Sequence, residues 1–167
     1  MAEQNEEDLA LSRRAAAGDS ASFAMLVEKY ERPLRSFLAR MGAPDPDDIA
    51  QDAFLKAWRF AGQYDGRARY STWLTRIAWR CRLDSLRRER VDEPRDEEPA
   101  SGHEQSAEVS DMLARLSDKE RAALILCEGH GWTHPEAAEL LDMPLGTLKS
   151  CVARAKTKCR EMWSDHG

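Results

Sequence analysis

The sequence contains no apolar run near the roughly 20 residues that a membrane-spanning helix needs. Its N-terminus is polar and acidic, which excludes a secretory signal peptide. The four cysteines have irregular spacing, which is typical of reduced thiols and not of a disulfide framework. These absences predict a cytoplasmic protein with no membrane insertion.

Motifs for catalysis and metal binding are also missing. The sequence has no glycine-rich phosphate loop and no nucleophile elbow. Cys127 and His130 have the spacing of two metal ligands, but no second pair completes a tetrahedral site. The acids Asp47, Asp48 and Asp52 offer metal ligands in principle, yet nothing around them suggests a catalytic partner. We therefore expect no enzymatic activity, no cofactor and no metal.

The charges are separated along the chain. The 25 basic and 30 acidic residues give a formal net charge of −5, which taken alone argues against nucleic-acid binding. Between Arg67 and Arg90, however, eight arginines stand against two acids, and between Val91 and Glu108 seven acids stand against one base. Because charges are screened beyond about 10 Å at moderate salt, local patches decide binding. The pattern predicts basic surfaces separated by an acidic tether.

Apolar residues recur at helical spacing, and no segment shows a strand signal, so the sequence predicts an all-α fold. Residues 1–17 form an N-terminal segment, expected to be frayed up to residue 7 and helical from Asp8. A long amphipathic helix covers residues 20–41, and Pro33 is expected to kink it or split it. The acidic residues 91–107 indicate a flexible linker. They separate two small helical domains, residues 18–90 and 108–164.

An acidic helix follows the first long one. Residues 45–48 place carboxylates where the positive end of the helix dipole favours them. Ile49, Ala53 and Phe54 belong to its inner face, and Asp48 and Asp52 lie outside. Two interpretations remain open: a solvated first turn, or a docking face for a basic partner.

Aromatic residues and arginines alternate in residues 61–70 and in the helix that follows. This helix is expected to be capped by Ser71 or Thr72 and to end near Arg90. Single-stranded nucleic acid needs this combination, because bases stack on aromatic rings while cations neutralise phosphates. The alternative is that the aromatics form the core and the arginines only keep the surface soluble. By periodicity Trp79 is a better candidate for an exposed contact than Trp73.

Residues 133–158 have the pattern of a helix-turn-helix. Thr133 and Glu136 form a capping box that opens a short helix, and Pro144 ends that helix. Ser117 and Glu120 form another capping box, which opens the preceding helix. The next helix, from Leu145, has a bulky apolar stripe and a slim polar face that carries Lys149 and Arg154. Such a face suits phosphates and base edges in a groove. An ordinary helical hairpin is the alternative for this stretch.

Four segments together resemble the bacterial RNA polymerase sigma factors of the extracytoplasmic-function type, over about residues 18–163. In chain order these segments read GDSASFAMLVEKYERPLRSFLARM, PDDIAQDAFLKAWR, YSTWLTRIAWRCRLDSLRR and LSDKERAALILCEGHGWTHPEAAELLDMPLGTLKSCVARAKTKCRE. The resemblance implies a subunit that directs core polymerase to promoters. It also implies contacts with the β′ coiled coil and the β flap of the core, and inhibition by an anti-sigma factor.

The resemblance also implies roles for individual residues. The β′ coiled coil would bind Asp48, Gln51, Asp52 and Phe54. The minus-ten element, melted and with one base flipped into a pocket, would contact Tyr64, Arg67, Arg69, Tyr70, Trp73, Arg76 and Arg80. The minus-thirty-five element would be read in the major groove by Thr147, Lys149, Ser150 and Arg154.

Two positions depart from the family pattern. Arg80 stands where the family often has Asn, which puts the minus-ten contacts there in doubt. Cys151 stands where the family usually has Arg, so one phosphate contact is missing, and the residue is either a redox-sensitive thiol or an inert small side chain. The competing function is a two-domain helix-turn-helix activator or repressor that is not a polymerase subunit.

Overall fold

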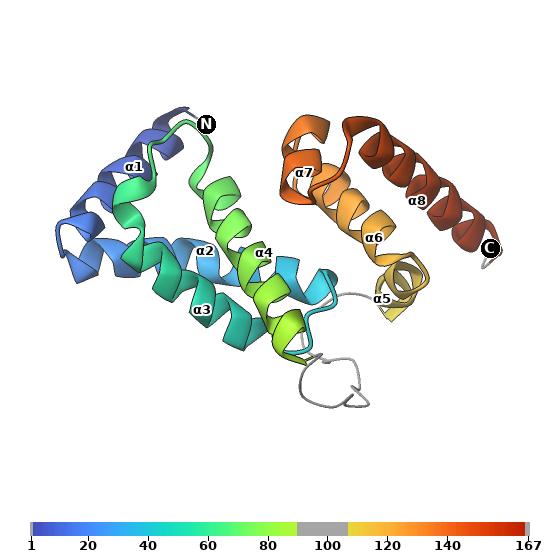
Figure 1. Ribbon diagram of the computed structural model, residues 1–167, viewed down its shortest axis with the longest axis horizontal. Helices are drawn as coiled ribbons and strands as arrows, with labels where there is room; N and C mark the ends of the chain where they lie inside the picture. The colour runs from blue at the N-terminus through green and yellow to red at the C-terminus, as the bar shows by residue number, and fades with distance from the viewer. Residues whose placement is uncertain (1, 90–106, 166–167) are drawn as a thin grey trace. The chain divides into compact units, whose positions relative to one another are not determined.

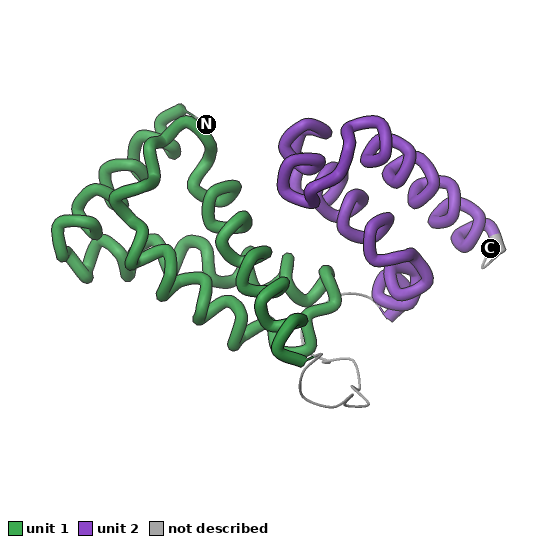
Figure 2. The backbone as a smooth tube through the Cα atoms, viewed as in Figure 1, with its two compact units in different colours: residues 1–100 green, residues 101–167 purple. Residues whose placement is uncertain are grey.

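The computed structural model describes residues 2–89 and 107–165. The chain divides into two compact units, residues 1–100 and residues 101–167 (Figure 2). All regular secondary structure among the described residues is helical, which confirms the all-α prediction. None of these helices is long and apolar enough to cross a membrane. Apart from Ala107, the predicted acidic linker lies outside the described residues.

The first unit is a bundle in which each long helix packs against the next (Figure 1). Its elements are α1 (Ala2–Ala16), α2 (Ser20–Arg40), α3 (Pro46–Arg59), the short 3₁₀ helix η1 (Ala61–Gln63) and α4 (Tyr70–Glu89). Asp19 caps α2 by accepting from the Ala21 and Ser22 amides, and Asp45 caps α3 by accepting from the Asp48 amide. The most buried core side chains come from α2, α3 and α4: Leu26, Leu38, Ala53, Ala57, Leu74 and Ala78.

Two expected helix starts in this unit were wrong, and one expected split was not found. The first helix starts at Ala2 and not at Asp8, because buried contacts of its N-terminal half hold it to the rest of the unit. Helix α2 runs through Pro33 without a split. Pro33, which cannot donate to the Lys29 carbonyl, is exposed, and Lys29 is half-buried. Helix α4 starts at Tyr70, so Ser71 and Thr72, which were expected to cap it, lie inside its first turn.

The second unit has four α-helices and one π-helical turn among its described residues. They are α5 (Ala107–Ala114), α6 (Asp118–Leu124), η2 (Ile125–Gly129), α7 (His134–Leu140) and α8 (Leu145–Asp165). Capping boxes open α6 at Ser117 and Glu120 and α7 at Thr133 and Glu136, which confirms the signals in the sequence. Helix α8 packs against α6 and α7 around Ala123, Leu126, Ala137, Leu148 and Ala155.

Candidate nucleic-acid and polymerase interfaces

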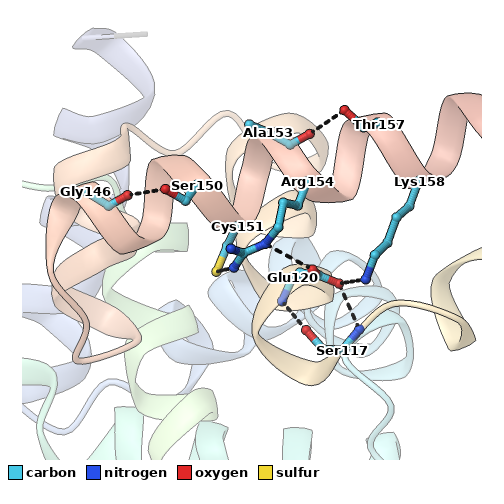
Figure 3. Close-up of polar contacts among 9 residues, drawn as sticks. All are labelled: Ser117, Glu120, Gly146, Ser150, Cys151, Ala153, Arg154, Thr157 and Lys158. Carbon is cyan, nitrogen blue, oxygen red and sulfur yellow. Dashed lines mark hydrogen bonds and ion pairs between the residues drawn. The ribbon is translucent and has the colours of Figure 1, made fainter.

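Helix α8 separates its side chains into a buried stripe and an exposed face. Leu148, Val152 and Ala155 are buried against the second unit's core. The opposite face is exposed, and we call it the recognition face; its predicted DNA contacts are Thr147, Lys149, Ser150 and Arg154. The Ser150 hydroxyl donates to the Gly146 carbonyl oxygen at 3.0 Å (Figure 3). The face therefore presents the exposed amine of Lys149, the guanidinium of Arg154, which is paired with Glu120, and small side chains, a shape that fits a groove of duplex DNA.

Glu120 ties the recognition helix to α6. Its carboxylate oxygens lie 3.4 Å from Arg154 Nε and 2.8 Å from Lys158 Nζ, and they accept from the Ser117 amide at 3.2 Å (Figure 3). The Glu120 side chain is only 6% exposed. The hydrogen bond from Lys158 is the largest of the effects that lower the pKa of Glu120. The ionised carboxylate of Glu120 thus holds α8 against α6 through Arg154 and Lys158.

Cys151 belongs to the buried stripe. Its side chain is 2% exposed, and Arg154 Nη2 lies 3.5 Å from its sulfur. A thiol in this position cannot meet oxidants or a phosphate without a change in packing. The burial therefore favours the inert small residue over the redox-sensitive thiol.

The two tyrosines at and just before the start of α4 favour the alternative that the sequence left open, in which the aromatic residues belong to the core. Tyr64 and Tyr70, both expected to stack on bases, are 4% and 1% exposed. Their rings pack edge to face with centroids 5.2 Å apart, and Tyr70 also packs on Tyr30 and Trp73. Burial raises the pKa of Tyr64 to about 12 and also raises that of Tyr70. These two rings form core, and they offer no face to a nucleotide.

The arginines of the same segment face solvent. We call residues 64–69 the arginine loop. Arg67 and Arg69 are exposed, and Asp65 shapes the turn by accepting from the Arg67 amide at 3.0 Å. The Arg67 guanidinium also lies 3.3 Å from the Asp65 carboxylate. The tyrosine rings are buried and the arginines are exposed, so this loop has a cationic outer surface that is supported by aromatic core residues.

A groove of about 550 Å³ runs between the end of α3 and one face of α4. Trp73, which is half-buried, and the exposed Arg80 both line it, so the structure brings these two predicted DNA contacts together. Arg76 is half-buried and Trp79, which was favoured over Trp73, is not among the lining residues. The sequence prediction missed the aromatic Phe60 and the cationic Arg87, which share this character, and the polar Gln63, all of which line the groove. Trp73, Arg80 and Arg87 recur at helical spacing, and that signal was available.

A second groove, of about 700 Å³, lies between α2 and α3. Asp48 and Gln51 are exposed on its rim, and Asp52 is exposed on the same helix. Phe54 is 8% exposed, and its ring packs edge-on against Phe23 at 6.5 Å, so it contributes to the floor. Leu55, which the sequence prediction missed, is 59% exposed at this groove. An acidic rim over an apolar floor suits a basic, amphipathic partner helix.

No group of three or more His, Cys, Asp or Glu side chains in residues 2–89 and 107–165 is arranged to hold a metal ion.

Comparison with known proteins gives two family matches and many relatives. Residues 26–91 match the family model for Sigma-70 region 2, and residues 106–159 match that for Sigma-70, region 4. The chain is 34% identical to RNA polymerase sigma factor NccH of Alcaligenes xylosoxydans xylosoxydans, over 90% of this chain and 91% of the relative. It is 31% identical to ECF RNA polymerase sigma factor RpoE of Cereibacter sphaeroides, over 87% and 88%.

Two solved structures have a similar fold. One is CnrH in complex with the cytosolic domain of CnrY, with a TM-score of 0.70 and 24% identity, over 96% of this chain and 99% of that chain. The other is RpoE of Bartonella quintana in complex with the anti-sigma factor NepR, with a TM-score of 0.69 and 24% identity, over 85% and 96%. At this identity the likeness shows a shared fold.

Proposed function

Since this chain belongs to the extracytoplasmic-function type of RNA polymerase sigma factors, we propose that its two units divide promoter recognition between them. Residues 18–90 act on core polymerase and on the minus-ten element, and residues 108–164 act on the minus-thirty-five element. The observation that carries this proposal is the pairing of an exposed recognition face on α8 with a cationic loop and groove on the first unit.

The groove between α2 and α3 receives the β′ coiled coil of the polymerase. Asp48, Gln51 and Asp52 provide exposed polar contacts, Leu55 adds an exposed apolar one, and Phe54 acts from the floor. A basic helix on this surface would gain charge complementarity at the rim and apolar burial at the centre. The second unit makes a further contact with the β flap.

The arginine loop and the α3–α4 groove bind the melted minus-ten strand. Arg67 and Arg69 are placed to neutralise phosphates, and Trp73 offers the half-exposed ring on which a base stacks. Arg80, with Phe60, Gln63 and Arg87, lines the path of the strand. Arg76 belongs to the same surface as a phosphate contact. Tyr64 and Tyr70 support this site from the core and do not contact DNA.

The recognition face of α8 enters the major groove at the minus-thirty-five element. Lys149 is exposed and reaches base edges or phosphates directly. Thr147, Ser150 and Arg154 contribute from the same face. Arg154 also pairs with Glu120, so its reach is directed by the core.

An anti-sigma factor is a further partner of the chain. A solved protein of this fold is in complex with an anti-sigma factor, and we extend such a partner to this chain. The protein acts in the cytoplasm, with polymerase and DNA, and it supplies recognition while the polymerase supplies catalysis. The competing activator or repressor does not account for a first unit that matches Sigma-70 region 2.

The test is in vitro transcription of a genomic fragment library by core polymerase, with and without the purified protein, followed by sequencing of transcript starts. We expect new starts that share two spaced sequence elements. The proposal would be contradicted if the protein bound duplex DNA but core polymerase made no specific transcript start in its presence. That result would favour the activator or repressor function.

A further inference from the structure

Helix α1 precedes the residues that match either family model, yet it is built into the site that we assign to the minus-ten element. Its first half carries a half-buried Asn5 and a buried Asp8. Helix α1 packs against α2 and against η1, the element just before the arginine loop (Figure 1). A segment at one end of the sequence therefore borders a loop about 60 residues away.

Asn5 contacts the arginine loop at two points. Its Nδ2 donates to the Gly66 carbonyl oxygen at 2.5 Å, and its Oδ1 lies 2.7 Å from the Tyr64 hydroxyl. The same hydroxyl lies 2.9 Å from the Ala68 carbonyl oxygen, and its single proton is shared between the two acceptors. One side chain thus connects the start and the middle of the loop.

Packing supports the same contact. Gly66 has a φ of +75°, and a Cβ placed there would lie 2.9 Å from Leu9 Cδ2. Further along α1, the Ser12 hydroxyl donates to the Ala61 carbonyl oxygen at 3.0 Å. The loop therefore lies directly on α1, and a side chain at position 66 would have to displace Leu9.

The other side of α1 is anchored to α2. The Asp8 carboxylate accepts from Lys29 Nζ at 2.6 Å and from the Tyr30 hydroxyl. Asp8 is 2% exposed, so its carboxylate is buried at both contacts. Helix α1 is fixed to the bundle by Asp8, and Asn5 lies three residues earlier on the same rigid element. Through its two hydrogen bonds, Asn5 therefore connects the loop to a helix that is fixed in the bundle.

We propose that α1 is the positioning element of the arginine loop and that Asn5 is its positioning residue. This inference rests on the proposed function, because the loop matters only if Arg67 and Arg69 hold the minus-ten strand. Asn5 holds the loop in its open-complex geometry before DNA arrives, so the ordering cost is not paid during melting. The inference adds a residue outside the matched family segments to the promoter-melting machinery.

The test compares Asn5→Ala with the matched control Gln4→Ala, which removes an exposed amide from the neighbouring position of the same helix. Hydrogen exchange of the full chain is measured at the amides of residues 64–69. We expect exchange there to be about tenfold faster in Asn5→Ala, from the loss of one or two hydrogen bonds. Gln4→Ala should exchange like the wild type. In holoenzyme at saturating concentration, Asn5→Ala should also form open complexes several-fold more slowly.

A double-mutant cycle with Tyr64→Phe tests the route of the effect. If Asn5 acts through the Tyr64 hydroxyl, the double variant should slow open-complex formation by less than the product of the two single effects. Independent, multiplicative effects would assign the action of Asn5 to Gly66 alone and overturn the two-point contact.

The inference is overturned if Asn5→Ala exchanges like Gln4→Ala in the loop, or if its loop exchanges faster while open complexes form at the wild-type rate. Equally faster hydrogen exchange across the whole first unit would also overturn the inference, because that result indicates general destabilisation. Failure of the proposed function has a separate signature: the wild-type holoenzyme would make no promoter-specific transcript, whatever the loop exchange shows.

Discussion

The recognition face of α8 and the arginine loop are both candidate DNA surfaces, but they are built differently. On α8 the helix itself decides which side chains face out, and the predicted contacts Thr147, Lys149, Ser150 and Arg154 are all exposed. In the loop no period applies, and contact with α1 draws Tyr64 into the core, while Tyr70, directly after the loop, packs on Tyr30 of α2. The difference teaches that a helix displays its faces locally, whereas a loop takes its orientation from distant segments.

The largest expected effect separates core from contact in the first unit. Tyr70→Ala removes a fully buried ring and should lower the free energy of unfolding by about 3–5 kcal/mol. Tyr70→Phe should cost nothing or stabilise slightly, because the buried hydroxyl has no hydrogen-bond partner among the described residues. Urea unfolding of both variants checks this. A Tyr70→Ala protein of wild-type stability with weakened DNA binding would restore the stacking role.

The next effect belongs to the recognition face. Lys149→Ala should weaken binding of the minus-thirty-five duplex by about 1–3 kcal/mol, the range of a good base contact. Its unfolding curve should not change, because Lys149 is exposed and outside the core. Arg160→Ala, which removes an exposed cation later on the same helix, is the control in the same duplex titration. Equal losses in the two variants would indicate only a general electrostatic effect.

A smaller effect is expected from pH. Since the folded state has the lower pKa, Glu120 stabilises the second unit fully above its ordinary value of 4.5, and this contribution is lost as the pH falls through the folded pKa. Glu120→Gln should therefore be less stable than the wild type at neutral pH. The gap between their unfolding midpoints should close below about pH 4.5, and a constant gap from pH 7 to pH 3 would contradict the ion pairs as its source.

The smallest effect is expected at Cys151. Because this thiol is buried, Cys151→Ala should bind DNA like the wild type, and thiol reagents should modify the half-buried Cys127 and Cys159 first. Mass spectrometry of partly modified protein gives the order. Early modification of Cys151 with loss of DNA binding would bring back the redox-sensitive thiol.

Much of the fold was predictable from local signals. The capping boxes at Ser117 and Thr133 and the stripe of α8 are short-range patterns, and the structure confirms them. The N-terminal start of α1 was missed because its stability comes from Asp8 and Asn5, whose partners lie far along the chain. For the same reason the sequence left the burial of Tyr64 and Tyr70 open as one of two alternatives. The groove face of α4 differs from these cases, because the helical spacing of Trp73, Arg80 and Arg87 already indicated it in the sequence.

The measurement that tests the division of labour most directly is permanganate footprinting of open complexes at saturating holoenzyme. We expect Lys149→Ala to need more holoenzyme but to reach the wild-type reactivity of the minus-ten thymines. A double variant, Arg67→Ala with Arg69→Ala, should occupy the promoter and leave those thymines weakly reactive. The opposite pattern, with melting lost in Lys149→Ala and retained in the double arginine variant, would contradict the assignment of the two surfaces.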